Sequence, residues 1–304
     1  MSSLPEGFSV RPVTPADAPA VNELAVAADE TVQGWSDSTE QDLVEWWRDV
    51  DLDRDSWYVS DGTGELAAYA MLYVHGEIAD LDGYVRPTLK GRGLGTWLLE
   101  RGEARGREKQ LPKTHTWALA PDAAARELFE LRGFREVRRY YRMLIELDGE
   151  PPDPEWPEGM HVETFTLHDS RDFYDALNEA FAEEWNWVPL PFDLWLERRV
   201  HAPEVDHSLW FIVRDGPEIA AVLRGDPNRF DAGWVGAVGV RKRWRKRGLG
   251  LSLLQHTFRE FRRRGQNRVA LGVDAENPTG ATRLYERAGM HVAYEAIAYE
   301  KSLA

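Results

Sequence analysis

The chain has 304 residues, 43% of them hydrophobic and 29% charged, with a formal net charge of −15, which suits a globular protein of two ordinary domains. The negative charge disfavours a general nucleic-acid binder, because phosphate contacts supply most of that affinity. The lack of cysteine excludes disulfides, thiolate metal sites and an acyl-cysteine intermediate. With no apolar run long enough for a membrane span and no signal-peptide pattern at the start, we expect a cytoplasmic protein that binds neither membranes nor nucleic acids.

The first predicted elements, within residues 8–24, are a short strand and a helix, with Thr14 or Asp17 available as the N-cap. The same order of elements begins again at Met160. The first sign of an internal duplication is that three residues recur at an offset of 152, with Thr14, Asp17 and Trp35 matching Thr166, Asp169 and Trp187.

Apolar runs then predict strands at residues 57–60 and 66–74, and again at 208–213 and 219–225, each pair lying ahead of a glycine-rich loop. After each loop we expect a helix, a strand, a second helix and a final pair of strands. This mixed order predicts an α+β fold in which helices pack on a sheet.

The glycine-rich loop itself occurs twice. Residues 85–95 read V-R-P-T-L-K-G-R-G-L-G and residues 240–250 read V-R-K-R-W-R-K-R-G-L-G, at an offset of 155. A third match, Leu128–Gly133 with Leu284–Gly289, follows at an offset of 156. Three matches in the same order indicate two copies of one fold. The segment 147–159 between them contains four prolines and is predicted to be a stiff linker, which gives domains at 1–150 and 151–304.

The second loop has the pattern of an anion site. A strand, a basic loop and a helix meet there, so backbone N–H groups and the positive end of the helix dipole point at one spot. Gly248 and Gly250 allow close approach of the main chain, and six basic residues within 241–247 favour a polyphosphate. Neither G-x-G-x-x-G nor G-x-x-x-x-G-K-[ST] is present. The alternatives are a simple turn and a solvated patch for nucleic acid or an acidic partner.

This loop resembles the pyrophosphate loop of the GCN5-related N-acetyltransferases, V-x-P-x-x-[RQ]-G-x-G-x-[GA]. Val240, Arg245, Gly248 and Gly250 match that pattern, whereas Lys246 replaces a glycine, so we expect a slightly altered backbone there. Residues 271–290 resemble the mycothiol synthase-like members of the family, which have two domains. The resemblance implies two tandem domains, each a mostly antiparallel mixed sheet flanked by helices, and acetyl-coenzyme A as the acyl donor.

The resemblance also implies residue roles. Asn277 would contact the pantetheine arm, the backbone of 238–240 would pair with that arm, and Tyr285 would donate a proton to the departing sulfur. No metal is expected. The residues implied to bind coenzyme A are Val238, Gly239, Val240, Arg245, Lys246, Arg247, Gly248, Leu249, Gly250, Leu251 and Asn277 in the second copy, and Val85, Lys90, Gly91, Arg92, Gly93, Leu94, Gly95 and Thr96 in the first.

The two copies differ where the chemistry would occur. The first copy has Pro121 and Phe129 where the second has Asn277 and Tyr285. A phenylalanine has no proton to give, so we expect transfer in the C-terminal copy and no productive binding in the N-terminal one. Because the chain has no cysteine to carry the acetyl group, we expect it to pass directly to the acceptor.

The acceptor side is less defined. Family members often carry a glutamate six residues before the valine that opens the loop, and here Trp234 and Ala79 occupy those places. The general base is therefore unassigned among Asp231, Glu183, Glu184 and Glu276. Trp185 and Trp187 are candidates to line the acceptor pocket.

The sequence thus predicts an N-acetyltransferase that acts on a primary amine of a small molecule, as a monomer or homodimer. The alternatives are transfer of a larger acyl group and a non-catalytic acyl-coenzyme A sensor or scaffold.

Overall fold

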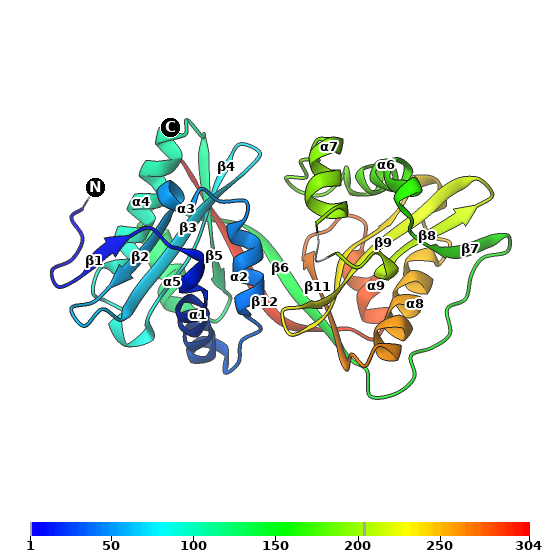
Figure 1. Ribbon diagram of the computed structural model, residues 1–304, viewed down its shortest axis with the longest axis horizontal. Helices are drawn as coiled ribbons and strands as arrows, with labels where there is room; N and C mark the ends of the chain where they lie inside the picture. The colour runs from blue at the N-terminus through cyan, green and yellow to red at the C-terminus, as the bar shows by residue number, and fades with distance from the viewer. Residues whose placement is uncertain (1, 203–204) are drawn as a thin grey trace. The chain divides into compact units, whose positions relative to one another are not determined.

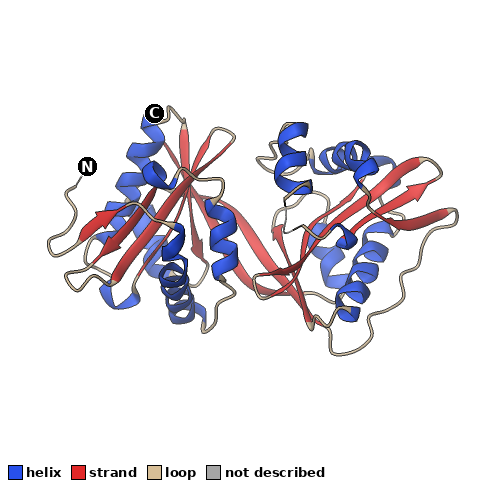
Figure 2. Ribbon diagram, in the orientation of Figure 1, coloured by secondary structure: helices blue, strands red, loops and turns tan. Residues whose placement is uncertain are grey.

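The computed structural model describes residues 2–202 and 205–304, and its chain forms two compact units (Figure 1). Unit 1 consists of Met1–Arg139 together with Glu295–Ala304, and unit 2 consists of Tyr140–Tyr294. In both units, helices cover the two faces of a sheet (Figure 2). The predicted α+β fold with a mixed, mostly antiparallel sheet in each half is confirmed.

Unit 1 has a sheet in the order β1-β2-β3-β4-β5-β12, antiparallel except for the parallel pair β4 and β5. Its elements are β1 (Ser9–Arg11), α1 (Ala18–Gln33), α2 (Glu40–Trp47), α3 (Leu52–Asp55), β2 (Ser56–Ser60), β3 (Leu66–His75), β4 (Ile78–Val85), α4 (Leu94–Glu108), β5 (Lys113–Leu119) and α5 (Ala123–Leu131).

Unit 2 has a sheet in the order β7-β8-β9-β10-β11-β6, antiparallel except for the parallel pair β10 and β11. Its elements are β7 (Met160–Thr164), α6 (Ser170–Phe181), α7 (Phe192–Trp195), β8 (Trp210–Asp215), β9 (Glu218–Arg229), β10 (Ala232–Val240), α8 (Leu249–Arg263), β11 (Arg268–Asp274) and α9 (Ala281–Arg287).

The two remaining strands are exchanged between the sequence halves. Strand β6 (Arg135–Glu146) follows the last helix of the first half, yet its residues 140–146 pair with β11 in unit 2. Strand β12 (His291–Ser302) follows the last helix of the second half, yet its residues 296–302 pair with β5 in unit 1. The compact units therefore differ from the predicted domains 1–150 and 151–304, because the pairing partner of a strand is set by tertiary structure.

The prediction of a final pair of strands in each copy is wrong. One strand of 12 residues stands in each place, at β6 and at β12. Neither segment contains a glycine, proline or asparagine at which a hairpin could turn, so the chain continues in one extended run.

Each sheet is buried on both faces. In unit 2, the face toward α8 and α9 packs Leu253, Phe258 and Phe261, and the opposite face packs Phe173 and Trp195 from α6 and α7. The corresponding two cores of unit 1 lie under α4 and α5 and under α1 and α2. None of the helices in the described part of the chain is long and apolar enough to cross a membrane.

The local structure repeats as the duplication predicted. The Thr14 amide donates to Asp17 at 2.8 Å, and the Thr166 amide donates to Asp169 at 3.0 Å, so the same capping box precedes α1 and α6. The predicted linker lies along α8 of unit 2, where Arg259 donates to the carbonyl of Pro151 at 2.7 Å.

Candidate active site

Unit 2 contains a cavity of about 670 Å³ where two strands of its sheet separate. Strands β10 and β11 pair only at Gly233 with Val269 and at Trp234 with Ala270. On its other edge β10 stays paired to β9 as far as Val240. Beyond Trp234, the edge of β10 that faces β11 has no strand partner in the described chain, so its backbone groups border the cavity.

The start of α8 forms one end of this cavity. Gly248 precedes the helix with φ of +88°, a left-handed conformation that favours glycine. Within the described residues, the backbone amides of 246–250 have no acceptor, whereas Leu251 and Ser252 donate to the carbonyl of Gly248. Because these open N–H groups lie at the positive end of the helix dipole, the loop can hold an anion as the sequence predicted.

Lys246 takes the backbone conformation of the glycine it replaces. Its φ is +64°, and the corresponding residue of unit 1, Gly91, has φ of +82°. The residues three positions and one position before each helix are therefore left-handed in both copies, since Gly93 has φ of +85° and Gly248 has φ of +88°. The expected change in loop shape at Lys246 is therefore small. A lysine in this conformation costs about 1 kcal/mol relative to glycine.

The basic run serves mainly to fasten the loop. The Arg245 guanidinium donates to the carbonyls of Val240 and Ala180, both at 3.2 Å, and to Glu183 at 2.6 Å. The other pairs in this run are Arg241 with Glu179, Lys242 with Glu183, Arg243 with Glu218 and Arg247 with Asp215. In the described chain Lys246 alone of the six has no carboxylate partner, and it lines the cavity.

Two further cations enter the cavity lining from α9, Arg283 and Arg287. Sequence reasoning missed both, because they lie some forty residues after the basic loop. Of the predicted coenzyme A residues in this copy, all line the cavity except Arg247, which lies 4.0 Å from Asp215.

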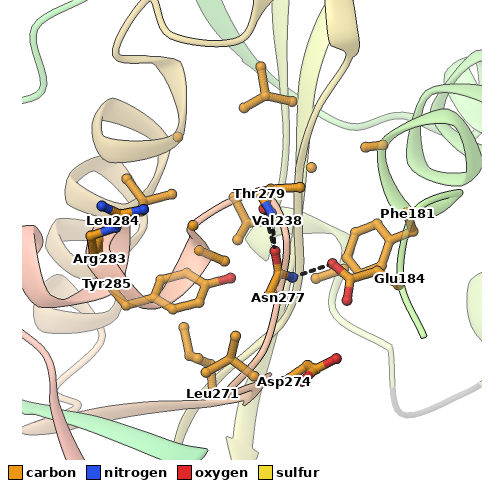
Figure 3. Close-up of a pocket in the computed structure, with 18 of the residues that line it drawn as sticks. Phe181, Glu184, Val238, Leu271, Asp274, Asn277, Thr279, Arg283, Leu284 and Tyr285 are labelled. Carbon is orange, nitrogen blue, oxygen red and sulfur yellow. Dashed lines mark hydrogen bonds between the residues drawn. The ribbon is translucent and has the colours of Figure 1, made fainter.

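Tyr285 projects from α9 into the middle of the cavity. Its side chain is 7% exposed, and its hydroxyl points toward Asn277 (Figure 3). The hydroxyl has no hydrogen-bond partner among the described residues. Burial raises the pKa of the Tyr285 phenol above its ordinary value of 10.0, and the negative charge of Glu184 raises it further. The phenol is therefore protonated at neutral pH.

Asn277 links the phenol side of the cavity to the segment that follows α6. Its Oδ1 accepts from the Thr279 amide at 2.8 Å, which fixes the turn after β11. Its Nδ2 donates to Glu184 at 2.5 Å (Figure 3). Asn277 thus holds the Glu184 carboxylate in place beside the position that Tyr285 faces.

The four candidate bases are now distinguishable by position. Glu184 lines the cavity. Glu183 is engaged by Arg245 and Lys242, which lower its pKa, and Asp231 pairs with Arg268 at the turn between β9 and β10. Glu276 does not line the cavity. Of the four, Glu184 alone lines the cavity.

Aromatic side chains form the wall around Glu184. Trp185 and Trp187 line the cavity, as the sequence predicted, together with Phe181 and Tyr140. Tyr140 was not foreseen, because it belongs to β6, which follows the first copy in the sequence but pairs in unit 2. Asp274, at the end of β11, was also missed as a lining residue.

Unit 1 contains a second, smaller cavity of about 500 Å³ at the matching place. It is lined by Val85, Lys90, Gly91, Gly93, Leu94, Gly95 and Thr96, so of the predicted residues Arg92 alone is outside the lining. Phe129 stands where Tyr285 stands in unit 2, and its ring packs edge-on against Tyr299 at 5.4 Å. This cavity has the glycine-rich loop before α4, but it has no phenol at the position that corresponds to Tyr285.

Comparison with known proteins identifies the family that has this architecture. The acetyltransferase (GNAT) family model matches residues 20–134 and 170–290. A mycothiol acetyltransferase of Thermobispora bispora is 32% identical over 291 residues, covering 91% of this chain and 93% of that protein. A mycothiol acetyltransferase of Catenulispora acidiphila is 28% identical, covering 92% and 94%.

Solved structures agree with this match. A GCN5-related N-acetyltransferase from Sphaerobacter thermophilus superposes with a TM-score of 0.88 at 36% identity, covering 99% of this chain and 97% of that one. A tandem GNAT protein from the clavulanic acid biosynthesis pathway shares the fold, with a TM-score of 0.75 at 16% identity and 98% and 99% coverage. This chain therefore belongs to the GNAT acetyltransferase family, whose acyl donor is acetyl-coenzyme A, and carries two tandem GNAT regions.

Proposed function

We propose that unit 2 transfers the acetyl group of acetyl-coenzyme A directly to a primary amine of a small molecule. One observation carries the proposal: the Tyr285 phenol and the Glu184 carboxylate face the same cavity whose far end is the open-amide loop before α8. These are a proton donor, a proton acceptor and an anion cradle, which together are what direct acyl transfer requires.

The cradle would hold the donor by its phosphates. The amides of 246–250 and the ammonium of Lys246 would face the pyrophosphate, and the open edge of β10 at 238–240 would pair with the pantetheine arm as a neighbouring strand does. The thioester would then lie between Asn277 and Tyr285.

Glu184 would take the proton from the acceptor ammonium, directly or through one water. The freed amine nitrogen attacks the thioester carbonyl carbon, the C–N bond forms, the nitrogen releases its second proton to solvent to leave the amide, and the C–S bond breaks. Tyr285 would deliver its proton to the departing sulfur and regain one from solvent. The phenol carries its proton at neutral pH, so that proton is available when the thiolate develops beside it.

Unit 1 would not catalyse this reaction. Phe129 offers no proton to a leaving thiolate, although the glycines of the cradle are retained. We propose that the first cavity binds an acyl-coenzyme A without turnover, or does not bind it.

The relatives suggest which acceptor should be tested first. Two proteins that align with more than nine-tenths of this chain are named mycothiol acetyltransferases, so the acceptor of that reaction is the first to assay. A panel of other primary amines should accompany it. The donors acetyl-, propionyl- and succinyl-coenzyme A would test the alternative of a larger acyl group.

The deciding experiment is turnover measured by release of free coenzyme A thiol, with Tyr285→Phe as the variant. We expect the variant to lose about 10²–10⁴-fold in kcat while its affinity for coenzyme A, measured by titration calorimetry, stays the same. Phe129→Ala in unit 1 is the matched control and should leave kcat unchanged. A sensor or scaffold would show no turnover in the wild-type protein with any amine.

A further inference from the structure

The lining of the unit 2 cavity is divided by charge. Its four basic side chains, Arg245, Lys246, Arg283 and Arg287, come from the loop before α8 and from α9. Its two acidic side chains, Glu184 and Asp274, come from the segment after α6 and from the end of β11. Figure 3 shows Arg283 on one side of Tyr285, with Glu184 and Asp274 across from it beyond Asn277. The end of the cavity opposite the cradle is therefore acidic.

The acidic end also has aromatic walls. Tyr140 and Trp185 lie with their ring centroids 6.4 Å apart and their planes at 52°. Phe181 and Trp187 lie 4.9 Å apart at 38°. Aromatic rings and carboxylates that line one cavity attract an organic cation.

We propose that this acidic aromatic end selects acceptors whose reacting amine enters as an ammonium and has no carboxylate beside it. The class is alkyl- or arylalkylammonium compounds rather than α-amino acids. The proposal rests on the acetyl transfer proposed above, because it concerns the acceptor of that reaction. Asp274 and Trp185 would be specificity-determining residues, and Glu184 would both hold the ammonium and take its proton.

A carboxylate next to the amine would meet like charge here. Glu184 and Asp274 would both lie near it, and the basic lining residues are at the other end. A like charge nearby in a partly desolvated site reduces binding on the order of tenfold or more.

Two other arginines of unit 2, Arg224 and Arg142, lie outside the cavity lining. Arg224 lies beside Gly236 next to a carboxylate: a Cβ at Gly236 would be 2.6 Å from Arg224 Nη2 and 3.0 Å from Asp226 Oδ2. The Arg142 guanidinium stacks over Phe230 at 4.1 Å and donates to the Tyr294 hydroxyl at 2.8 Å. Neither arginine lines the cavity.

Three matched acceptors test the proposal: tyramine, tyrosine and tyrosinamide. They differ only in whether the carbon beside the amine carries hydrogen, a carboxylate or an uncharged amide, so tyrosinamide controls for size. With acetyl-coenzyme A as donor, we expect kcat/KM to be about tenfold or more higher for tyramine and tyrosinamide than for tyrosine. Equal or better use of tyrosine would overturn the proposal.

Two variants test the residues. Asp274→Asn keeps the oxygen that accepts from the Glu276 amide at 2.9 Å but removes the charge. We expect it to raise KM for tyramine several-fold, to narrow the preference over tyrosine, and to leave KM for acetyl-coenzyme A unchanged. Asp193→Asn, on an exposed position of α7 outside the lining, is the control. Trp185→Leu, which removes the aromatic wall and no charge, should also raise KM for tyramine.

Binding separates this proposal from the transferase function. If no amine is acetylated, the proposed function fails, yet titration of the same three compounds in the presence of coenzyme A still measures selectivity. Tighter binding of tyramine than of tyrosine supports the acidic acceptor site by itself. Equal binding, tighter binding of tyrosine, or no binding of tyramine would overturn it.

Discussion

Gly250 and Leu284 are in such close contact that a Cβ added to Gly250 would lie 2.8 Å from Leu284 Cδ2. Gly250 is in the first turn of α8, at the cradle, and Leu284 is the residue before Tyr285 on α9. The separation of these two helices therefore fixes how far the phenol stands from the loop before α8. The same contact exists in unit 1, where a Cβ at Gly95 would lie 2.9 Å from Leu128 Cδ2.

We predict that Gly250→Ala lowers kcat more than it lowers affinity for coenzyme A, because the new methyl displaces α9 and Tyr285 with it. The loss should be on the order of tenfold or more, since small displacements of a positioned group are costly in rate. Leu284→Ala combined with Gly250→Ala should restore part of kcat by making room for the methyl. Gly95→Ala disturbs the same contact in unit 1 and should leave kcat unchanged. Equal losses from both glycine variants would contradict this account.

We predict that Lys246→Gly weakens coenzyme A binding by a few-fold without lowering thermal stability. The glycine removes one ammonium from the cavity lining, worth about 1 kcal/mol near the surface, but suits the left-handed φ of +64°. Arg247→Ala is the control for loss of charge, because Arg247 lies outside the lining. Affinities should be measured by calorimetry at low and high salt. A larger effect from Arg247→Ala would place the phosphates elsewhere.

We predict that Glu184→Gln lowers kcat/KM for the amine at neutral pH, while Asn277→Ala has a smaller effect in the same direction. The first removes the proton acceptor, and the second removes the 2.5 Å hydrogen bond that holds it. A base of this kind contributes roughly 10²–10⁴-fold. At higher pH more of the amine is already neutral, so the defect of Glu184→Gln should shrink as pH rises. A defect independent of pH would indicate that Glu184 only holds the acceptor.

The phenol sets a further expectation for the pH profile. Because the pKa of Tyr285 is raised above 10.0, its loss of a proton cannot reduce activity near pH 9. If the wild-type rate falls in that pH range, the rate of Tyr285→Phe should fall in the same way. Measuring the residual rate of that variant across pH checks this point.

We predict that Asp82→Asn stabilises the chain at about pH 8 more than at about pH 5. Burial raises the pKa of the Asp82 carboxyl from 3.8 to about 7, and the charges of Asp80 and Asp29 add to this. The folded state thus holds the proton where the unfolded state has lost it, so the free energy of unfolding falls as pH rises between these values. The asparagine has no charge to bury and should remove this fall. The gain at the higher pH should be about 1 kcal/mol or more.

Thermal or urea unfolding at both pH values measures this difference. Asp53→Asn, at an exposed position of α3, is the control and should change stability little at either pH. A similar gain for Asp82→Asn at both pH values would show that the effect is not the burial of a charge.

The sequence by itself determined the features that depend on near neighbours in the chain. The repeated Thr–x–x–Asp boxes, the glycines with positive φ and the replacement of Phe129 by Tyr285 all follow from local patterns and their spacing. They could be predicted because capping and left-handed turns need only the residues within a few positions. The fold and the family followed from the order of these patterns.

Tertiary structure alone decided the exchange of β6 and β12, and with it the presence of Tyr140 in the unit 2 cavity. It also decided that most of the basic run is paired with carboxylates, and that Glu184 rather than Glu183 lines the cavity. The physical reason is the same in each case. Strand partners and the direction of a charged side chain are set by residues far away in the sequence, whose positions exist only once the sheet has formed.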